Sequence, residues 1–138
     1  MNVRDVMTRN PRTIAPNDSI QRAASVMKEV DTGFVPIVEN GKVVGVVTDR
    51  DIVIRAVAAG SYDRPVSEIA TRDLVFVAPG DSTRDAEKLM SERQIRRVAV
   101  VDGGQLVGIV SLGDLAVKEG KDSRTGETLE SISEGVKH

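Results

Sequence analysis

The sequence has no cysteine and almost no aromatic residues among its 138 amino acids. Without cysteine the chain forms no disulfide, presents no thiol nucleophile and offers no thiolate to a metal. Its only histidine is the last residue, His138, which argues against histidine-based catalysis. Two phenylalanines and one tyrosine leave no platform for stacked bases, and a formal net charge of −2 lacks the basic excess of a nucleic-acid or membrane-surface binder.

Long apolar runs are also missing. No stretch approaches the roughly 18 apolar residues of a membrane span, and the first residues lack the apolar centre of a signal peptide. We therefore expect a cytoplasmic protein. An apolar share of 40% with 29% charged residues is typical of a folded chain, and the length suits one compact domain or two small lobes.

The chain contains an internal sequence repeat with two copies. Residues 3–53 align with residues 66–116 at a constant offset of 63 without a gap, and 17 of the 51 positions are identical. A repeat too small to bury its own apolar face stacks on its copy, so we expect a pseudo-twofold pair. The expected divisions are a first repeat (1–58), a connector (59–65), a second repeat (66–118) and a polar C-terminal tail (119–138).

Each repeat is predicted to run strand, helix, strand, strand, helix, which places the chain in the α/β (α+β) class. Short extended segments at residues 12–15 and 75–78 are each followed by a proline, which has no amide hydrogen to continue a strand. An Asp–Ser pair then signals a helix start in both repeats, because its oxygens can accept from unpaired first-turn amides. These pairs are Asp18-Ser19 and Asp81-Ser82.

Two apolar strands follow this helix in each repeat. They are joined by Asn-Gly at residues 40–41 and by Gly-Gly at residues 103–104, and both dipeptides suit the positive φ angles of a tight hairpin. A second helix is expected to begin near Asp49 in the first repeat and near Leu112 in the second.

The most specific feature is a motif that closes each hairpin. It consists of glycine, two apolar residues, a hydroxyl residue, two variable positions and an aspartate, with Thr48 and Asp51 in the first copy and Ser111 and Asp114 in the second. A carboxylate in the first turn of a helix can accept from a ribose diol, while free amides at the same helix end favour phosphate. The spacing is also that of a capping box, in which hydroxyl and carboxylate satisfy each other's amides. Both interpretations fit the sequence.

Through this motif, its spacing and the gapless repeat, residues 3–117 resemble the tandem CBS (cystathionine-β-synthase) domain pair, also called a Bateman module. Short stand-alone bacterial CBS proteins are particularly similar. The resemblance implies a non-catalytic regulatory sensor with clefts between the two repeats, each binding an adenosine-containing ligand such as AMP, ADP, ATP, NAD or S-adenosylmethionine. It also implies a homodimer that signals to an unidentified effector protein and requires no cofactor or metal.

The resemblance further implies a ribose-binding role for Thr48 with Asp51 and for Ser111 with Asp114. Adenine would contact backbone at the opening strand of the opposite repeat. The residues expected to face adenine are Leu74 and Val75 for the first-repeat motif, and Pro11 and Arg12 for the second-repeat motif.

Basic residues often precede the third structural element in this family, and here the repeats differ. Arg96 and Arg97 hold that position in the second repeat, whereas the first has Gly33 and Phe34. Because two guanidiniums can clamp a phosphate, we expect the second-repeat site to bind phosphate more tightly, unless Arg50 or other arginines supply charge to the first. An arginine pair at a helix end is also consistent with a purely structural role.

Two other classes of function compete with a sensor. An enzyme is disfavoured because the sequence has no internal histidine, no cysteine, no Gly-x-Ser-x-Gly elbow and no Gly-x-x-x-x-Gly-Lys-Ser/Thr phosphate loop. The alternative is a ligand-free interaction or dimerisation module, since exposed apolar helix faces commonly mark interfaces.

Overall fold

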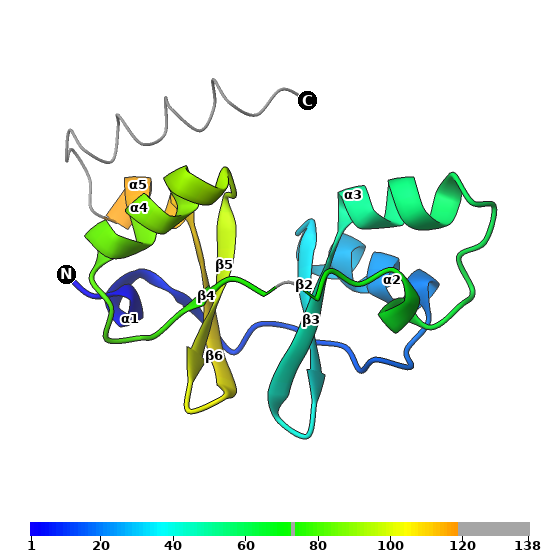
Figure 1. The fold of residues 1–138 in the computed structure, drawn as a ribbon, viewed down its shortest axis with the longest axis horizontal. Coiled ribbons are helices and arrows are strands. Elements are labelled where there is room, and N and C mark those ends of the chain that lie inside the picture. The colour runs from blue at the N-terminus through cyan, green and yellow to red at the C-terminus, as the bar shows by residue number, and fades with distance from the viewer. Residues whose placement is uncertain (73, 119–138) are drawn as a thin grey trace. The chain divides into compact units, whose positions relative to one another are not determined.

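The computed structural model describes residues 1–72 and 74–118, which form two compact units (Figure 1). The repeat-1 unit comprises residues 11–74 and 103–106. The repeat-2 unit comprises residues 1–10, residues 75–102 and the chain from residue 107. The opening residues of each repeat thus belong to the unit built mainly from the other repeat. The predicted polar tail lies outside the described residues.

The repeat-1 unit is built around the hairpin of β2 and β3. Ile14 forms a parallel bridge with Ile37 of β2, and Thr71 pairs antiparallel with Val46 of β3. Two backbone hydrogen bonds, 2.9 and 3.0 Å long, join Thr71 to Val46. The elements of this unit are α2 (Ile20–Val30), β2 (Phe34–Glu39), β3 (Lys42–Thr48), α3 (Asp49–Ile52), the π-helix η1 (Val53–Val57) and the 3-10 helix η2 (Val66–Glu68).

The repeat-2 unit has the matching arrangement. Strand β4 runs parallel to β5, which pairs with β6, and β1 lies antiparallel to β6 with Thr8 opposite Ile109. The elements are α1 (Val3–Val6), β1 (Thr8–Arg9), β4 (Phe76–Val77), α4 (Thr83–Arg93), β5 (Arg97–Asp102), β6 (Gln105–Ser111) and α5 (Leu112–Lys118).

The predicted helix starts are confirmed. Ser19 Oγ accepts from the Arg22 amide at 3.0 Å, and Ser82 Oγ accepts from the Asp85 amide at 3.0 Å, so both serines are N-caps. The aspartate before each serine instead accepts from an amide three residues earlier in the chain, at 2.8 and 2.9 Å. The serine therefore caps the helix, while the aspartate stabilises the turn that precedes it.

The predicted hairpin turns are confirmed as well. Asn40 and Gly41 have φ of 53° and 81°, and Gly103 and Gly104 have φ of 59° and 84°. Positive φ at both central residues is the condition that favours Asn-Gly and Gly-Gly in two-residue hairpins.

Other expectations need correction. The strand expected at 12–15 is reduced to a single bridge at Ile14, and that expected at 75–78 is only the two-residue β4. The second helix of the first repeat starts at Asp49 as expected but changes from α3 into the π-helix η1. The short elements α1, β1 and η2 were not predicted. No helix in the described part of the chain is long and apolar enough to cross a membrane.

Each unit has an apolar core that includes residues from the opening of the other repeat. Val66 and Ile69 are buried in the core of the repeat-1 unit, together with Val35 and Ile37 of β2. Val3, Val6 and Met7 are buried in the core of the repeat-2 unit. The residues before each first strand are therefore structural parts of a core.

We predict that Val6→Ala lowers the free energy of unfolding by about 2 kcal/mol, because it removes two fully buried methyl groups and leaves a cavity. Denaturant unfolding followed by circular dichroism measures this loss. The control is Val30→Ala, whose side chain is 40% exposed at the end of α2 and whose change should stay within about 0.5 kcal/mol. Equal stabilities of the two variants would contradict a core role for the N-terminal segment.

Candidate functional site

The hydroxyl–aspartate motif of the first repeat lies where β3 meets α3. Thr48 Oγ1 accepts from the Asp51 amide at 3.1 Å, and Asp51 Oδ2 accepts from the Thr48 amide at 3.0 Å. These reciprocal bonds form the capping box that the spacing indicated. One amide uses only one of about four lone-pair sites on a carboxylate, so the same group can still accept hydrogen bonds from a ligand.

The carboxylate of Asp51 also meets two side chains that the sequence did not single out. Thr71 Oγ1 donates to it, at 3.3 Å from Oδ2 and 3.5 Å from Oδ1, and Arg55 Nε lies 4.0 Å from Oδ1. Arg50 is exposed and forms no ion pair within the described residues. The positive charge beside Asp51 thus comes from Arg55, one helical turn further on, and the Asp51 side chain is only 12% exposed.

The second-repeat motif forms the same capping box between β6 and α5. Ser111 Oγ accepts from the Asp114 amide at 2.9 Å, and Asp114 Oδ2 accepts from the Ser111 amide at 3.2 Å. The counterpart of Thr71 at the 63-residue offset is Thr8, which pairs with β6. Within the described residues the Asp114 carboxylate accepts only from the Ser111 amide, through Oδ2, and Oδ1 accepts no hydrogen bond from them. Asp114 is therefore the more accessible of the two motif carboxylates.

The residues at the start of β2 and β5 lie next to these motifs. The Gly33 carbonyl accepts from the Asp49 amide at 3.0 Å, and Phe34 pairs with Thr48 across the hairpin. A Cβ added at Gly33 would lie 2.6 Å from Asp49 Oδ2, so a larger residue there would require the exposed Asp49 side chain to move. The structure therefore brings Gly33 and Phe34 to the first-repeat motif.

The arginine pair occupies the matching place in the repeat-2 unit. The Arg96 carbonyl accepts from the Leu112 amide at 2.9 Å, which ties it to the first residue of α5. Both Arg96 and Arg97 are exposed, and neither forms an ion pair with any residue in the described ranges. The repeat-2 unit thus contains Ser111, Asp114 and two exposed arginines, and the backbone of Arg96 lies next to the first residue of α5.

The four residues expected to face adenine divide between the units. Leu74 belongs to the repeat-1 unit and is half-buried, whereas Val75 packs against the core of the repeat-2 unit. Pro11 and Arg12 belong to the repeat-1 unit, and Arg12 forms an ion pair with Glu29 at 3.1 Å. Their proposed contacts with adenine stay a prediction.

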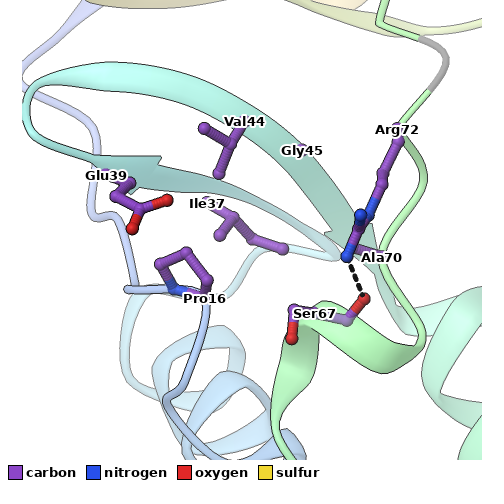
Figure 2. Close-up of a pocket in the computed structure, with 8 residues that line it drawn as sticks. All are labelled: Pro16, Ile37, Glu39, Val44, Gly45, Ser67, Ala70 and Arg72. Atoms are coloured by element: carbon purple, nitrogen blue, oxygen red, sulfur yellow. Dashed lines mark hydrogen bonds between the residues drawn. The ribbon is translucent and has the colours of Figure 1, made fainter.

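A cavity of about 130 Å³ lies in the repeat-1 unit beside Gly45, the glycine that opens the first-repeat motif (Figure 2). Ala70 and Arg72, the chain neighbours of Thr71, form part of its wall. Sequence reasoning missed Arg55, Thr71 and this cavity. The repeat carried a signal for Thr71, because it is identical to Thr8 at the same offset that aligns the two motifs.

Comparison with known proteins gives a consistent result. The CBS domain family model matches residues 3–57 and 66–118. The chain is 46% identical over 132 residues to the CBS domain-containing protein YhcV of Bacillus subtilis, covering 95% of this chain and 94% of YhcV. It is 34% identical over 116 residues to Hypoxic response protein 1 of Mycobacterium tuberculosis, covering 82% of this chain and 81% of that protein.

Solved structures of CBS proteins also match. The CBS domain pair of protein MJ0100, in complex with 5′-methylthioadenosine and S-adenosyl-L-methionine, has a TM-score of 0.79 and 31% identity and covers 88% of this chain and 98% of its own. CBSX2 in complex with AMP has a TM-score of 0.76 and 26% identity, over 86% of this chain and 95% of its own. With two matched domains along most of its described length, the chain belongs to the CBS domain family as a tandem CBS pair.

Proposed function

We propose that this protein is a non-catalytic regulatory module that binds an adenosine-containing ligand through its two hydroxyl–aspartate motifs. The observation that carries the proposal is the repeated placement of a carboxylate at a strand-to-helix junction, at Asp51 and Asp114. Two structurally similar CBS proteins were crystallised with such ligands: 5′-methylthioadenosine and S-adenosyl-L-methionine in one, AMP in the other.

Of the two motifs, the second-repeat motif is the better candidate for the tighter binding site. Asp114 uses one oxygen for its capping bond and has the other available for a ribose hydroxyl. Arg96 and Arg97 can supply charge-assisted hydrogen bonds to a phosphate or carboxylate of the ligand. Asp51 already accepts from Thr71, and its side chain is only 12% exposed, which makes the first-repeat motif the weaker site.

Ligand binding would regulate through linkage. A ligand that binds only one state stabilises that state by about 2.7 kcal/mol at a hundredfold excess over its Kd. That amount can shift an equilibrium with a second subunit or with an effector protein, provided that affinity differs between the states.

A homodimer is the second part of the proposal, and helix η1 offers a surface for it. Val53, Ile54 and Val57 of this five-residue helix are 56%, 57% and 58% exposed. Three large apolar side chains exposed on one short helix are typical of a surface that binds another protein subunit. This surface also supports the alternative function, a dimerisation module that binds no nucleotide.

We predict that Asp114→Ala lowers affinity for AMP or S-adenosylmethionine about tenfold or more, because hydrogen bonds to a charged group contribute about 1.5–3 kcal/mol. Asp51→Ala should have a smaller effect on total binding. Isothermal titration calorimetry with AMP, ADP, ATP, NAD and S-adenosylmethionine would measure both variants against the natural sequence.

The control separates ribose binding from capping. Asp114→Ala also removes half of a capping box, and such a loss lowers stability by about 1 kcal/mol. Ser82→Ala removes the N-cap of α4, outside the motif, and should lower stability similarly while leaving affinity unchanged. If no ligand of the panel binds the natural sequence, the nucleotide proposal is wrong and the dimerisation module remains.

We also predict that replacing Arg96 and Arg97 together by glutamine lowers the affinity for AMP about tenfold and leaves the affinity for adenosine almost unchanged. Only AMP carries a phosphate whose charge the two guanidiniums would bind. Fluorescence or calorimetric titration of both ligands gives the comparison. An equal loss for AMP and adenosine would contradict the phosphate role.

For the dimer, we predict that Ile54→Glu shifts the protein from dimer to monomer at micromolar concentration, because a charge would be buried at the apolar surface of η1. Size-exclusion chromatography with light scattering measures the mass. Tyr62→Glu, at an exposed connector position, is the control and should stay dimeric. A natural sequence that is monomeric at all concentrations would overturn this part of the proposal.

A further inference from the structure

The cavity beside Gly45 lies entirely within the repeat-1 unit and contains none of the motif residues from 48 to 51. Its volume of about 130 Å³ is well above the roughly 30 Å³ that one water molecule takes up in the liquid. The wall is mostly apolar, with Ile37 only 1% exposed. The lining residues are Pro16, Ile37, Glu39, Val44, Gly45, Ser67, Ala70 and Arg72.

The repeat-2 unit fills the corresponding place with one of its own side chains. Met7 stands 63 residues before Ala70, and it is 7% exposed within the core of its unit. A Cβ added at Gly108 would lie 2.7 Å from Met7 Sδ, so the thioether rests directly on that glycine. At the matching Gly45, the nearest side-chain atom to such a Cβ is the Ala70 Cβ, at 3.4 Å.

The surrounding framework is the same in both units. Arg72 donates to the Ser67 carbonyl at 3.1 Å, and Arg9 donates to the Arg4 carbonyl at 3.4 Å, which are matching bonds at the 63-residue offset. The β-pairing of the adjacent threonine is also shared. The cavity therefore reflects a missing methionine side chain at Ala70 within an otherwise repeated framework.

Two opposite charges stand at the rim of the cavity. Glu39 and Arg72 are both exposed, and Figure 2 shows them on opposite sides of Ile37. Arg72 uses one N–H for the Ser67 carbonyl, and a guanidinium has five such donors. Arg72 can thus still bind a carboxylate, while Glu39 can accept hydrogen bonds from an ammonium group.

We propose that this cavity binds a free zwitterionic amino acid with an unbranched apolar side chain of about methionine length. Its side chain occupies the space that Met7 occupies in the other unit, along Ile37 and Ala70. Its carboxylate pairs with Arg72 and its ammonium group with Glu39. The lining contains neither Thr48 nor Asp51, so the site stands whether or not those residues bind an adenosine ligand.

Titration of the full chain with L-methionine and L-norleucine, by calorimetry and by NMR chemical-shift mapping, tests the site. Both amino acids should bind with similar affinity and shift the signals of residues around Ala70, whereas n-pentanol, which lacks both charges, should bind at least tenfold more weakly. Ala70→Met should abolish binding and raise Tm, because it fills the cavity from within. Ala70→Leu provides a second filling variant if Ala70→Met does not fold.

The repeat offers a matched control for the charge. Arg72→Gln should lower the affinity for L-methionine about tenfold. Arg9→Gln, at the matching position in the repeat-2 unit, should leave that affinity unchanged. The proposal is overturned if neither amino acid binds saturably, if binding survives both filling variants, or if n-pentanol binds as tightly as L-norleucine. None of these outcomes depends on AMP, so failure here leaves the nucleotide proposal standing, and the reverse also holds.

Discussion

The opening segment of each repeat completes the unit built from the other repeat. Backbone pairing of Thr71 with β3 and of Thr8 with β6 holds these segments in place, and the buried residues beside them join the two cores. A single repeat therefore lacks part of its own core, which is why such units occur in pairs. The same pairing brings Thr71 to the Asp51 carboxylate and sets Ala70 against Gly45, so the surroundings of Asp51 and the wall of the cavity both depend on it.

A carboxylate that caps a helix is well suited to bind a ligand. The reciprocal bonds with Thr48 or Ser111 hold each aspartate at the start of its helix and leave lone pairs unused. Because the backbone bonds are the same in both repeats, differences between the two sites come from neighbouring side chains. Asp51 meets Thr71 and Arg55, whereas Asp114 lies in the unit that contains the exposed Arg96 and Arg97, for which residues 1–72 and 74–118 supply no ion-pair partner.

Duplication also explains how one unit can keep a cavity that the other fills. The turns, caps and arginine–carbonyl bonds are repeated and do not involve the side chain at position 7 or 70. A difference between methionine and alanine at these matching positions alters the packing of one unit and leaves the framework intact. The protein thereby acquires two similar units with different interior surfaces.

The sequence alone determined the repeat, which is read directly from the alignment of its two copies. It also determined the helix caps, the hairpin turns and the position of the hydroxyl–aspartate motif, because these features depend on residues no more than about four positions apart. It also identified the family. Only the tertiary structure decided that segments before each first strand join the opposite unit, that Thr71 and Arg55 engage Asp51, and that Ala70 leaves a cavity. The Thr71 contact joins residues 20 positions apart in the chain. Such contacts follow from the packing of whole elements, which local propensity and spacing do not specify.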